Sequence, residues 1–176
     1  MPKKVVLTGP ESTGKSFLTH QLAVHFQCPQ VPEMARAYLG NLDRPYTFED
    51  VEAIARQQLM AEEKAMSENA PLIFCDTNLL VIKIWMLHSW GHCPQWILQS
   101  LKFNPGDLTL LCDIDMPWQP DPLREHPHLR QYFADWYRRE LEQSGTIWQW
   151  VKGTGEDRTA LAISHVRHHF QSVLEE

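Results

Sequence analysis

The chain has 176 residues, of which 43% are hydrophobic and 22% are charged, and its formal net charge is -6. This composition is typical of a globular domain with a substantial core, and it excludes a disordered or membrane-embedded chain. The acidic balance argues against nucleic acid as the main partner, because surfaces that bind nucleic acid are usually basic. We find no apolar run of the roughly 20 residues that a membrane helix needs and recognise no signal peptide, so we expect a cytoplasmic protein with reduced cysteines and no membrane partner.

The first predicted strand and helix enclose a phosphate-binding motif. Lys4–Thr8 reads as a short apolar strand and Phe17–Phe26 as an amphipathic helix, and Gly9–Ser16 between them fits the pattern G-x-x-x-x-G-K-[ST] in full. Glycines let the backbone wrap phosphates, so that successive N–H groups and the helix N-terminus point at negative charge. The alternative is a chance match in a Gly-rich turn, and the strand–loop–helix context argues against it.

The motif predicts a site for ATP and Mg²⁺. Lys15 is expected to reach the β- and γ-phosphates, and the Ser16 hydroxyl is expected to ligate Mg²⁺. The residues predicted to contact the nucleotide are Gly9, Glu11, Ser12, Thr13, Gly14, Lys15, Ser16 and Phe17.

The rest of the chain alternates between strands and helices. Further apolar strand-like runs lie at 30–32, 72–75, 108–112 and 146–151, and helical patterns cover 47–69, 79–90, 127–144 and 158–174. This alternation predicts an α/β fold with a five-stranded, mostly parallel sheet covered by helices on both faces. No linker or repeat divides the chain, so residues 1–176 are predicted to form a single domain.

Charged residues follow two of the predicted strands. Glu33 and Arg36 come after the strand at 30–32, and Asp76 and Thr77 come after the strand at 72–75. Strand ends open onto the ligand crevice of a parallel nucleotide-binding sheet. A carboxylate there can accept the proton of an attacking hydroxyl or hold Mg²⁺, and an arginine can balance phosphate charge. The alternatives are a surface ion pair for Glu33 and Arg36 and a helix N-cap for Thr77.

Two further loops carry chemistry-bearing residues. After the strand at 108–112 the chain contains Asp113, Asp115, Trp118, Asp121, Arg124 and Arg130. A loop with two arginines can close as a lid, place positive charge against a migrating phosphoryl group and exclude water, although a solvated charged loop explains the same residues. The stretch 153–158 could lie under an adenine base, or it could be a turn in which Asp157 caps the last helix. The histidines lack the spacing of a zinc site, and Trp85, Trp90 or Trp118 could stack on a flat ligand.

Together these features resemble the ribosylnicotinamide kinase domain of NadR-type bacterial proteins. The resemblance extends from Lys4 to the last helix and rests on the phosphate loop, the Glu33–Arg36 pair, Asp76-Thr77 and the stretch Trp118-x-x-Asp121-x-x-Arg124. It implies a nucleotide-kinase-like P-loop NTPase, a three-layer sandwich with a lid segment at about 116–135. It also implies transfer of a phosphoryl group from ATP, with Mg²⁺, to the 5′-hydroxyl of nicotinamide riboside, which yields nicotinamide mononucleotide for NAD biosynthesis.

The resemblance also implies roles for individual residues. The predicted catalytic residues are Lys15, Glu33, Asp76 and Arg124, the predicted acceptor-binding residues are Glu33, Arg36, Asp76, Trp118, Asp121 and Arg130, and the predicted metal-binding residues are Ser16 and Asp76. Glu33 also resembles the general base that follows the second strand in deoxynucleoside kinases. Either Glu33 or Asp76 could therefore be the base.

One departure from the family concerns its neighbouring domains. NadR-type proteins usually carry an adenylyltransferase domain before the kinase, whereas here the phosphate loop begins at Gly9. We therefore expect a separate adenylyltransferase to complete NAD synthesis. The alternative functions are a kinase for another nucleoside or small metabolite and a regulatory ATPase that acts on a partner protein. The sequence leaves the oligomeric state open, a homo-oligomer included.

Overall fold

The computed structural model describes residues 1–175 and is built around a parallel sheet. The strands are β1 (Lys3–Thr8), β2 (Gln30–Val31), β3 (Leu72–Asp76), β4 (Leu108–Cys112) and β5 (Trp148–Val151). They are arranged in the order β2-β3-β1-β4-β5, and all four pairings are parallel. The central strands β3 and β4 are buried throughout and β1 is buried from Lys4 onward, as expected for parallel strands that are covered on both faces. The predicted five-stranded α/β fold is confirmed.

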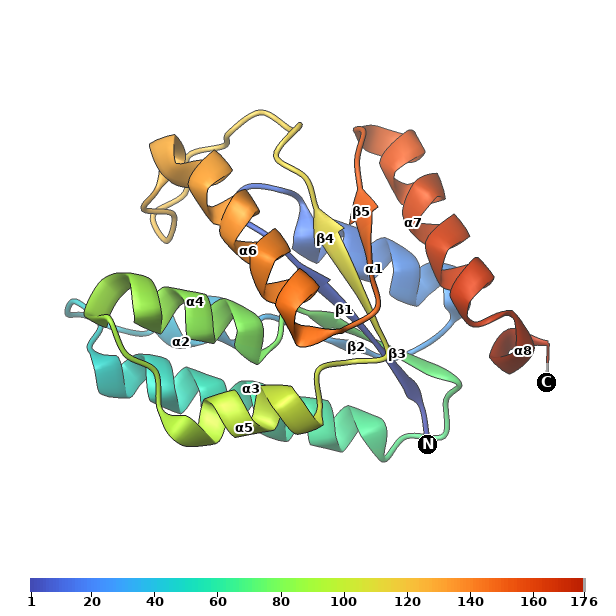
Figure 1. Ribbon diagram of the computed structural model, residues 1–176, viewed down its shortest axis with the longest axis horizontal. Coiled ribbons are helices and arrows are strands. Elements are labelled where there is room, and N and C mark those ends of the chain that lie inside the picture. Colours follow the sequence, from blue (N-terminus) through green and yellow to red (C-terminus); the bar gives the residue numbers. More distant parts are fainter. Residues whose placement is uncertain (176) are drawn as a thin grey trace.

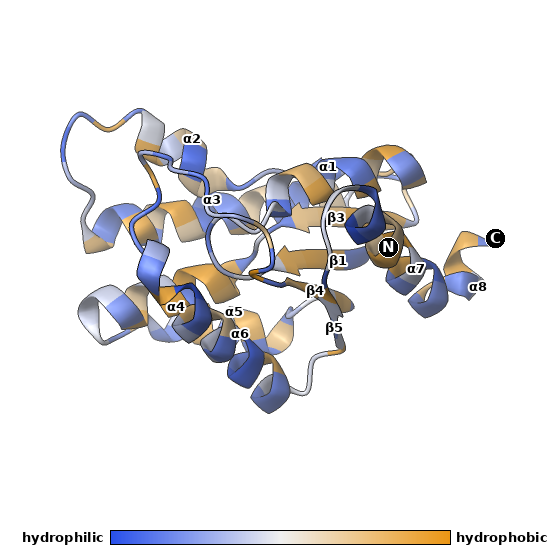
Figure 2. Ribbon diagram, turned by 90° about the horizontal axis from the view of Figure 1, so that it is seen from above, coloured by the Kyte–Doolittle hydropathy of each residue, from blue (hydrophilic) through white to orange (hydrophobic). Residues whose placement is uncertain are grey.

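Helices cover both faces of the sheet, which makes three layers (Figure 1). One face is covered by α1 (Lys15–Phe26), α7 (Gly155–His169) and the short α8 (Gln171–Leu174). The other face carries α2 (Met34–Gly40), α3 (Phe48–Met66), α4 (Leu79–Trp90), α5 (Gln95–Phe103) and α6 (Arg130–Ser144), the last preceded by a 3₁₀ turn at Pro127–Leu129. Apolar colour runs through the strands and the inward sides of the helices, and polar colour marks their outer sides (Figure 2).

Several local predictions differ from the structure. Helices α2 and α5 were not expected, because they are short (7 and 9 residues), and only Ile97 is buried among them, so their periodicity is weak. The helix expected at 127–144 begins as the 3₁₀ turn, and the last helix begins at Gly155 and is interrupted at Phe170. The expected strand at 146–151 begins only at Trp148.

The helix N-caps correct two of the alternatives read from the sequence. Thr47 caps α3 in a capping box with Asp50. The cap of α4 is Asn78, whose Oδ1 accepts from the Leu80 N–H at 3.0 Å, and Thr77 before it has a left-handed φ of 69°. Thr154 occupies the N-cap position of α7, so Asp157 lies in the first turn and does not cap the helix.

The cysteines and the helices can be compared with the expectations of reduced thiols and no membrane helix. The four cysteines are free, and three of them, Cys28, Cys75 and Cys112, are buried. Within residues 1–175, no helix is both long and apolar enough to cross a membrane.

A buried ion pair joins the sheet to α3. The Lys4 ammonium donates to Glu62 Oε2 at 2.9 Å and to the Asn104 carbonyl at 3.0 Å, and the two side chains are only 2% and 3% exposed. Burial raises the pKa of Glu62, and the Lys4 charge opposes that shift. Each charge is therefore tolerated in the core only because of the other.

We expect Lys4→Met to destabilise the protein by about 3–5 kcal/mol, because Glu62 is left buried without a counter-charge. The double variant Lys4→Met/Glu62→Leu should lose less than the single variant, since no buried charge remains. Urea unfolding measures both. Arg138→Met, which breaks an exposed pair with Glu142, is the control and should change stability by less than about 1 kcal/mol. The single variant Glu62→Leu completes the comparison. A double variant whose loss of stability equals the sum of the losses in Lys4→Met and Glu62→Leu would contradict this account.

Candidate active site

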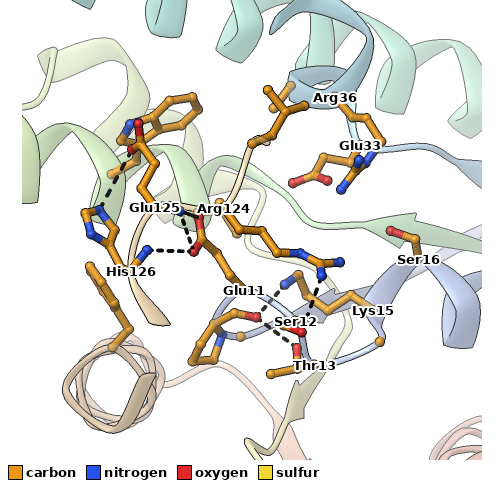
Figure 3. A pocket seen from close by; sticks show the side chains of 18 of the residues that line it. Glu11, Ser12, Thr13, Lys15, Ser16, Glu33, Arg36, Arg124, Glu125 and His126 are labelled. Atoms are coloured by element: carbon orange, nitrogen blue, oxygen red, sulfur yellow. Dashed lines mark hydrogen bonds and ion pairs between the residues drawn. The ribbon is translucent and has the colours of Figure 1, made fainter. Parts of the chain in front are cut away.

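The carboxyl ends of the central strands open onto one cavity. In a parallel sheet these ends meet at one edge, and here β1 leads into the phosphate loop, β3 ends in Asp76 and β4 leads into residues 113–126. The cavity has a volume of about 790 Å³ and is lined by residues of the phosphate loop, α2, α4, α6 and the segment that precedes α6. Figure 3 shows Lys15, Glu33 and Arg124 directed toward the same region.

The phosphate loop has a backbone shape that requires glycine. Gly9 has a φ of 133°, and a Cβ there would lie 2.7 Å from the carbonyl oxygen of Cys112. Gly14, at the N-cap of α1, has a φ of 74°. Inside the loop the Thr13 hydroxyl and the Lys15 ammonium both donate to the Pro10 carbonyl, at 2.9 and 2.7 Å. The N-terminus of α1 and the Lys15 charge thus lie together, as an anion site requires.

Two arginines bind main-chain carbonyls of the phosphate loop. Arg130 donates to the Ser12 carbonyl at 3.1 Å, and Arg158 donates to the Thr13 carbonyl at 3.0 Å. Because the N–H and C=O of a trans peptide point in opposite directions, these contacts turn the Thr13 and Gly14 N–H groups away from the arginines. Arg158 is 4% exposed and pairs with Asp115 at 2.7 Å. No sequence spacing links Arg158 to Thr13, so this contact could not be predicted from the sequence.

The two predicted acids lie beside the phosphate loop. Asp76 is buried, and burial raises its pKa, opposed by the Ser16 hydroxyl and the Lys15 charge. Burial also raises the pKa of Glu33. The Lys15 charge opposes this shift, and the Asp76 charge increases it. Lys15 thus acts on both carboxyl groups. The β3 end, the residue before α2 and the phosphate loop therefore form one electrostatic unit.

The oxygen atoms near Ser16 fit a magnesium site. Among residues 1–175, Asp76 Oδ1 is enclosed and has no hydrogen-bond partner, although the Ser16 hydroxyl lies beside this carboxyl group. Carboxylate and hydroxyl oxygens are ligands that Mg²⁺ takes, and it commonly binds through one or two carboxylates together with substrate phosphates. No group of three or more His, Cys, Asp or Glu side chains in this part of the chain could hold a metal by itself.

The segment before α6 lies over the phosphate loop. The Ser12 hydroxyl accepts from the Gln119 N–H at 2.9 Å and from the Arg124 guanidinium at 3.4 Å. The Glu11 carboxylate accepts from the Glu125 and His126 N–H groups, each at 3.2 Å (Figure 3). The phosphate loop therefore positions the predicted lid segment through two of its own side chains.

Of the remaining predicted site residues, Trp118, Asp121 and Arg130 lie outside the cavity lining, and Arg36 is part of it. Arg36 lines the cavity and pairs with Asp121 at 3.0 Å, and within residues 1–175 it forms no ion pair with Glu33. Asp121 and Trp118 belong to the lid segment but do not line the cavity, and the Trp118 ring packs 5.9 Å from the Arg130 guanidinium. Arg130 itself donates to the main-chain carbonyls of Met116 and Ser12. The structure thus gathers Lys15, Ser16, Glu33, Arg36 and Arg124 at the cavity, with Asp76 beneath it.

An aromatic wall faces the phosphate loop across the cavity. It consists of Tyr46, Trp85, His88, Phe133 and Tyr137. The Tyr46 hydroxyl donates to Glu125 at 2.8 Å and accepts from the Trp85 indole N–H at 3.2 Å. Four of these residues were missed in the sequence, because they come from three separate segments. Trp85 was one of three candidate tryptophans; Trp90 packs instead on Phe48 and does not line the cavity.

Of the stretch 153–158, only Gly153 and Thr154 precede α7, and the residues that line the cavity here come from the first turns of that helix. Gly155, Arg158 and Thr159 line the cavity, and Phe17 lies on the same lining. Arg158 also donates to the Gly153 carbonyl at 2.8 Å, so the loop before α7 and the phosphate loop share one guanidinium.

A parallel sheet in this order, with a phosphate loop after β1 and helices on both faces, defines a P-loop protein of the nucleotide-kinase type. A family model described as an AAA domain matches residues 4–158, and the chain belongs to this family.

Solved structures share the fold. A NadR protein in complex with NR superposes with a TM-score of 0.75 at 23% identity, over 96% of this chain and 51% of that one. A NadR protein in complex with NAD and AMP-PNP gives a TM-score of 0.70 at 24% identity, over 96% and 49%. The chain thus spans about half the length of the NadR chains it matches. The NadR-like P-loop kinase fold is confirmed.

Nucleotide and nucleoside kinases share it as well. Thymidylate kinase from Ehrlichia chaffeensis matches with a TM-score of 0.68 at 11% identity, over 95% of this chain and 98% of that one. Deoxyadenosine kinase from M. mycoides with bound dATP gives a TM-score of 0.64 at 11% identity, over 93% and 99%. Such identities show the common fold.

The raised pKa values of Glu33 and Asp76 have a consequence for stability. In both groups the folded-state pKa lies above the unfolded value, so the folded protein holds protons to higher pH than the unfolded chain does. The ionised groups therefore destabilise the protein increasingly as pH rises from the unfolded pKa of about 4 through the folded pKa.

We expect Glu33→Gln and Asp76→Asn to raise the Tm by a few degrees at pH 7.5, measured with EDTA and without nucleotide, and to raise it less at pH 5. Glu63→Gln, an exposed carboxylate on α3, serves as the control and should leave the Tm unchanged at both pH values. Variants that are less stable than the wild type at pH 7.5 would show that these carboxylates contribute to the fold.

Proposed function

We propose that this protein is an ATP-dependent kinase that phosphorylates the 5′-hydroxyl of nicotinamide riboside to give nicotinamide mononucleotide. The observation that carries the proposal is the Glu33 carboxylate, which lines the cavity within electrostatic reach of Lys15, the phosphate-binding lysine. A carboxylate so placed suits an acceptor hydroxyl. A protein that only hydrolyses ATP as a switch would have no use for the aromatic wall behind it.

The nucleotide is held by the phosphate loop in this proposal. Main-chain N–H groups of the loop and the α1 N-terminus bind the phosphates, and Lys15 leaves the Pro10 carbonyl to bind the β- and γ-phosphates. Ser16 and Asp76 would hold Mg²⁺, which neutralises charge on the β- and γ-phosphates when bound. The loop at 153–158 and Phe17 are placed to border the base.

The acceptor is activated by Glu33. Its carboxylate orients the 5′-hydroxyl and takes its proton while the oxygen attacks the γ-phosphorus; the bond to the bridging oxygen breaks, and ADP leaves. A raised pKa makes Glu33 a stronger base than an ordinary carboxylate. Arg124, held at the phosphate loop through Ser12, supplies positive charge to the migrating group.

The choice of nicotinamide riboside rests on resemblance. The Trp118-x-x-Asp121-x-x-Arg124 stretch resembles NadR-type proteins, and a NadR protein is known in complex with NR. The aromatic wall suits a flat acceptor ring.

The decisive experiment measures ADP release from Mg-ATP with and without nicotinamide riboside, and follows nicotinamide mononucleotide by mass. We expect riboside-dependent product at about 1 s⁻¹ or faster, the lower end for kinases. ADP release without any dependence on the riboside, and without mononucleotide, would overturn the substrate assignment. A panel of other nucleosides then separates a different kinase from an ATPase.

Two variants separate phosphate binding from base catalysis. Lys15→Ala should lower turnover by about 10²–10³-fold or more, because it removes a charge that stabilises the transferring phosphoryl group. The exposed Lys64→Ala on α3 is its control.

Glu33→Gln should lower kcat by about 10²-fold or more while ATP affinity, measured by calorimetry, stays near that of the wild type. Wild-type kcat/KM should fall at low pH with an apparent pKa above the ordinary carboxyl value, and Glu33→Gln should lose that step. A Glu33→Gln enzyme with near wild-type kcat would remove Glu33 from the role of base and leave Asp76.

A further inference from the structure

Tyr137 lies on the cavity wall between α4 and α6. Its side chain is only 5% exposed, and its ring packs in an apolar cluster with Leu80, Ile84, Leu111 and Leu141. It nevertheless lines the cavity, as does Phe133 one helical turn earlier. The ring is therefore fixed by packing while one end of the side chain faces the cavity.

The Tyr137 hydroxyl has no partner inside the protein. Among residues 1–175 it forms no hydrogen bond. The hydroxyl oxygen is not fully enclosed by the protein, so it reaches the cavity that Tyr137 lines. Buried tyrosine hydroxyls usually have a hydrogen-bond partner. If packing alone were needed here, phenylalanine would serve, as it does at Phe133 on the same helix face.

The charges around this hydroxyl indicate what it can bind. Burial raises the pKa of Tyr137 well above its usual range, and the Glu33 and Glu11 carboxylates raise it further. The hydroxyl is therefore a neutral group that can donate one hydrogen bond and accept another. Both carboxylates line the same cavity as Tyr137, so the hydroxyl shares that cavity with Glu33, the residue proposed to bind the acceptor's reacting end.

The geometry points to Tyr137 as a specificity residue that hydrogen-bonds a hydroxyl of the acceptor's sugar. This inference rests on the proposed function, in which Glu33 binds the 5′-hydroxyl. The sugar then lies beside Glu33 and Tyr137, and the flat ring lies among Tyr46, Trp85 and Phe133. A buried hydroxyl that loses its only partner is costly, so Tyr137 selects ribosides over their deoxy analogues.

The test compares Tyr137→Phe with the wild type on nicotinamide riboside and on its 2′-deoxy and 3′-deoxy analogues. We expect kcat/KM for the riboside to fall about 10- to 100-fold, mainly through KM. KM for ATP should stay unchanged. The preference of the wild type for the riboside over one of the deoxy analogues should shrink by the same factor, which a merely structural role would not produce.

The matched control is Tyr132→Phe, which removes a hydroxyl from an exposed tyrosine on the same helix and should leave all rates unchanged. Tyr137→Phe should fold with an unaltered or higher Tm, because the hydroxyl makes no internal bond. An active wild type with an undiminished Tyr137→Phe overturns this inference alone, as does a variant that keeps the full preference against both deoxy analogues. If the wild type phosphorylates no nucleoside, the proposed function and this inference fall together.

Discussion

The backbone shape of the phosphate loop is the constraint on which the rest of the structure depends. Gly9 lies so close to the Cys112 carbonyl that no larger residue fits, which ties the loop to the end of β4. Arg130 and Arg158 bind the carbonyls of two consecutive residues of the loop, Ser12 and Thr13. A loop whose peptide groups are oriented in advance loses little conformational freedom when it binds an anion.

The same loop organises the surrounding segments. Its Glu11 and Ser12 side chains bind the segment before α6, and Arg158 connects it to the loop before α7 and, through Asp115, to the segment after β4. This arrangement explains how residues more than 100 positions apart meet at one cavity.

Function and stability oppose each other at the cavity. Burial raises the pKa of both Glu33 and Asp76, and the Asp76 charge raises the pKa of Glu33 further. This arrangement reduces the free energy of unfolding at neutral pH. Lys15 offsets part of that cost for both. Shifted pKa values of this kind are common where a site must bind charge or move a proton. The buried Lys4–Glu62 pair is the contrasting case, in which two charges neutralise each other.

The sequence by itself determined the fold class, the apolar strands of the sheet and the phosphate loop. These follow from local patterns: an apolar strand, a glycine-rich motif and a helix are contiguous, so Lys15 and Ser16 could be assigned before any tertiary contact was known. Glu33 and Asp76 were found because they follow strands, whose carboxyl ends share one edge. Only the tertiary structure decided the partners of Arg130 and Arg158 and the composition of the aromatic wall. These contacts join segments that are far apart in the sequence and share no periodicity. The role of a side chain such as Tyr137 depends on the residues that pack around its ring and on the absence of a hydrogen-bond partner for its hydroxyl among residues 1–175.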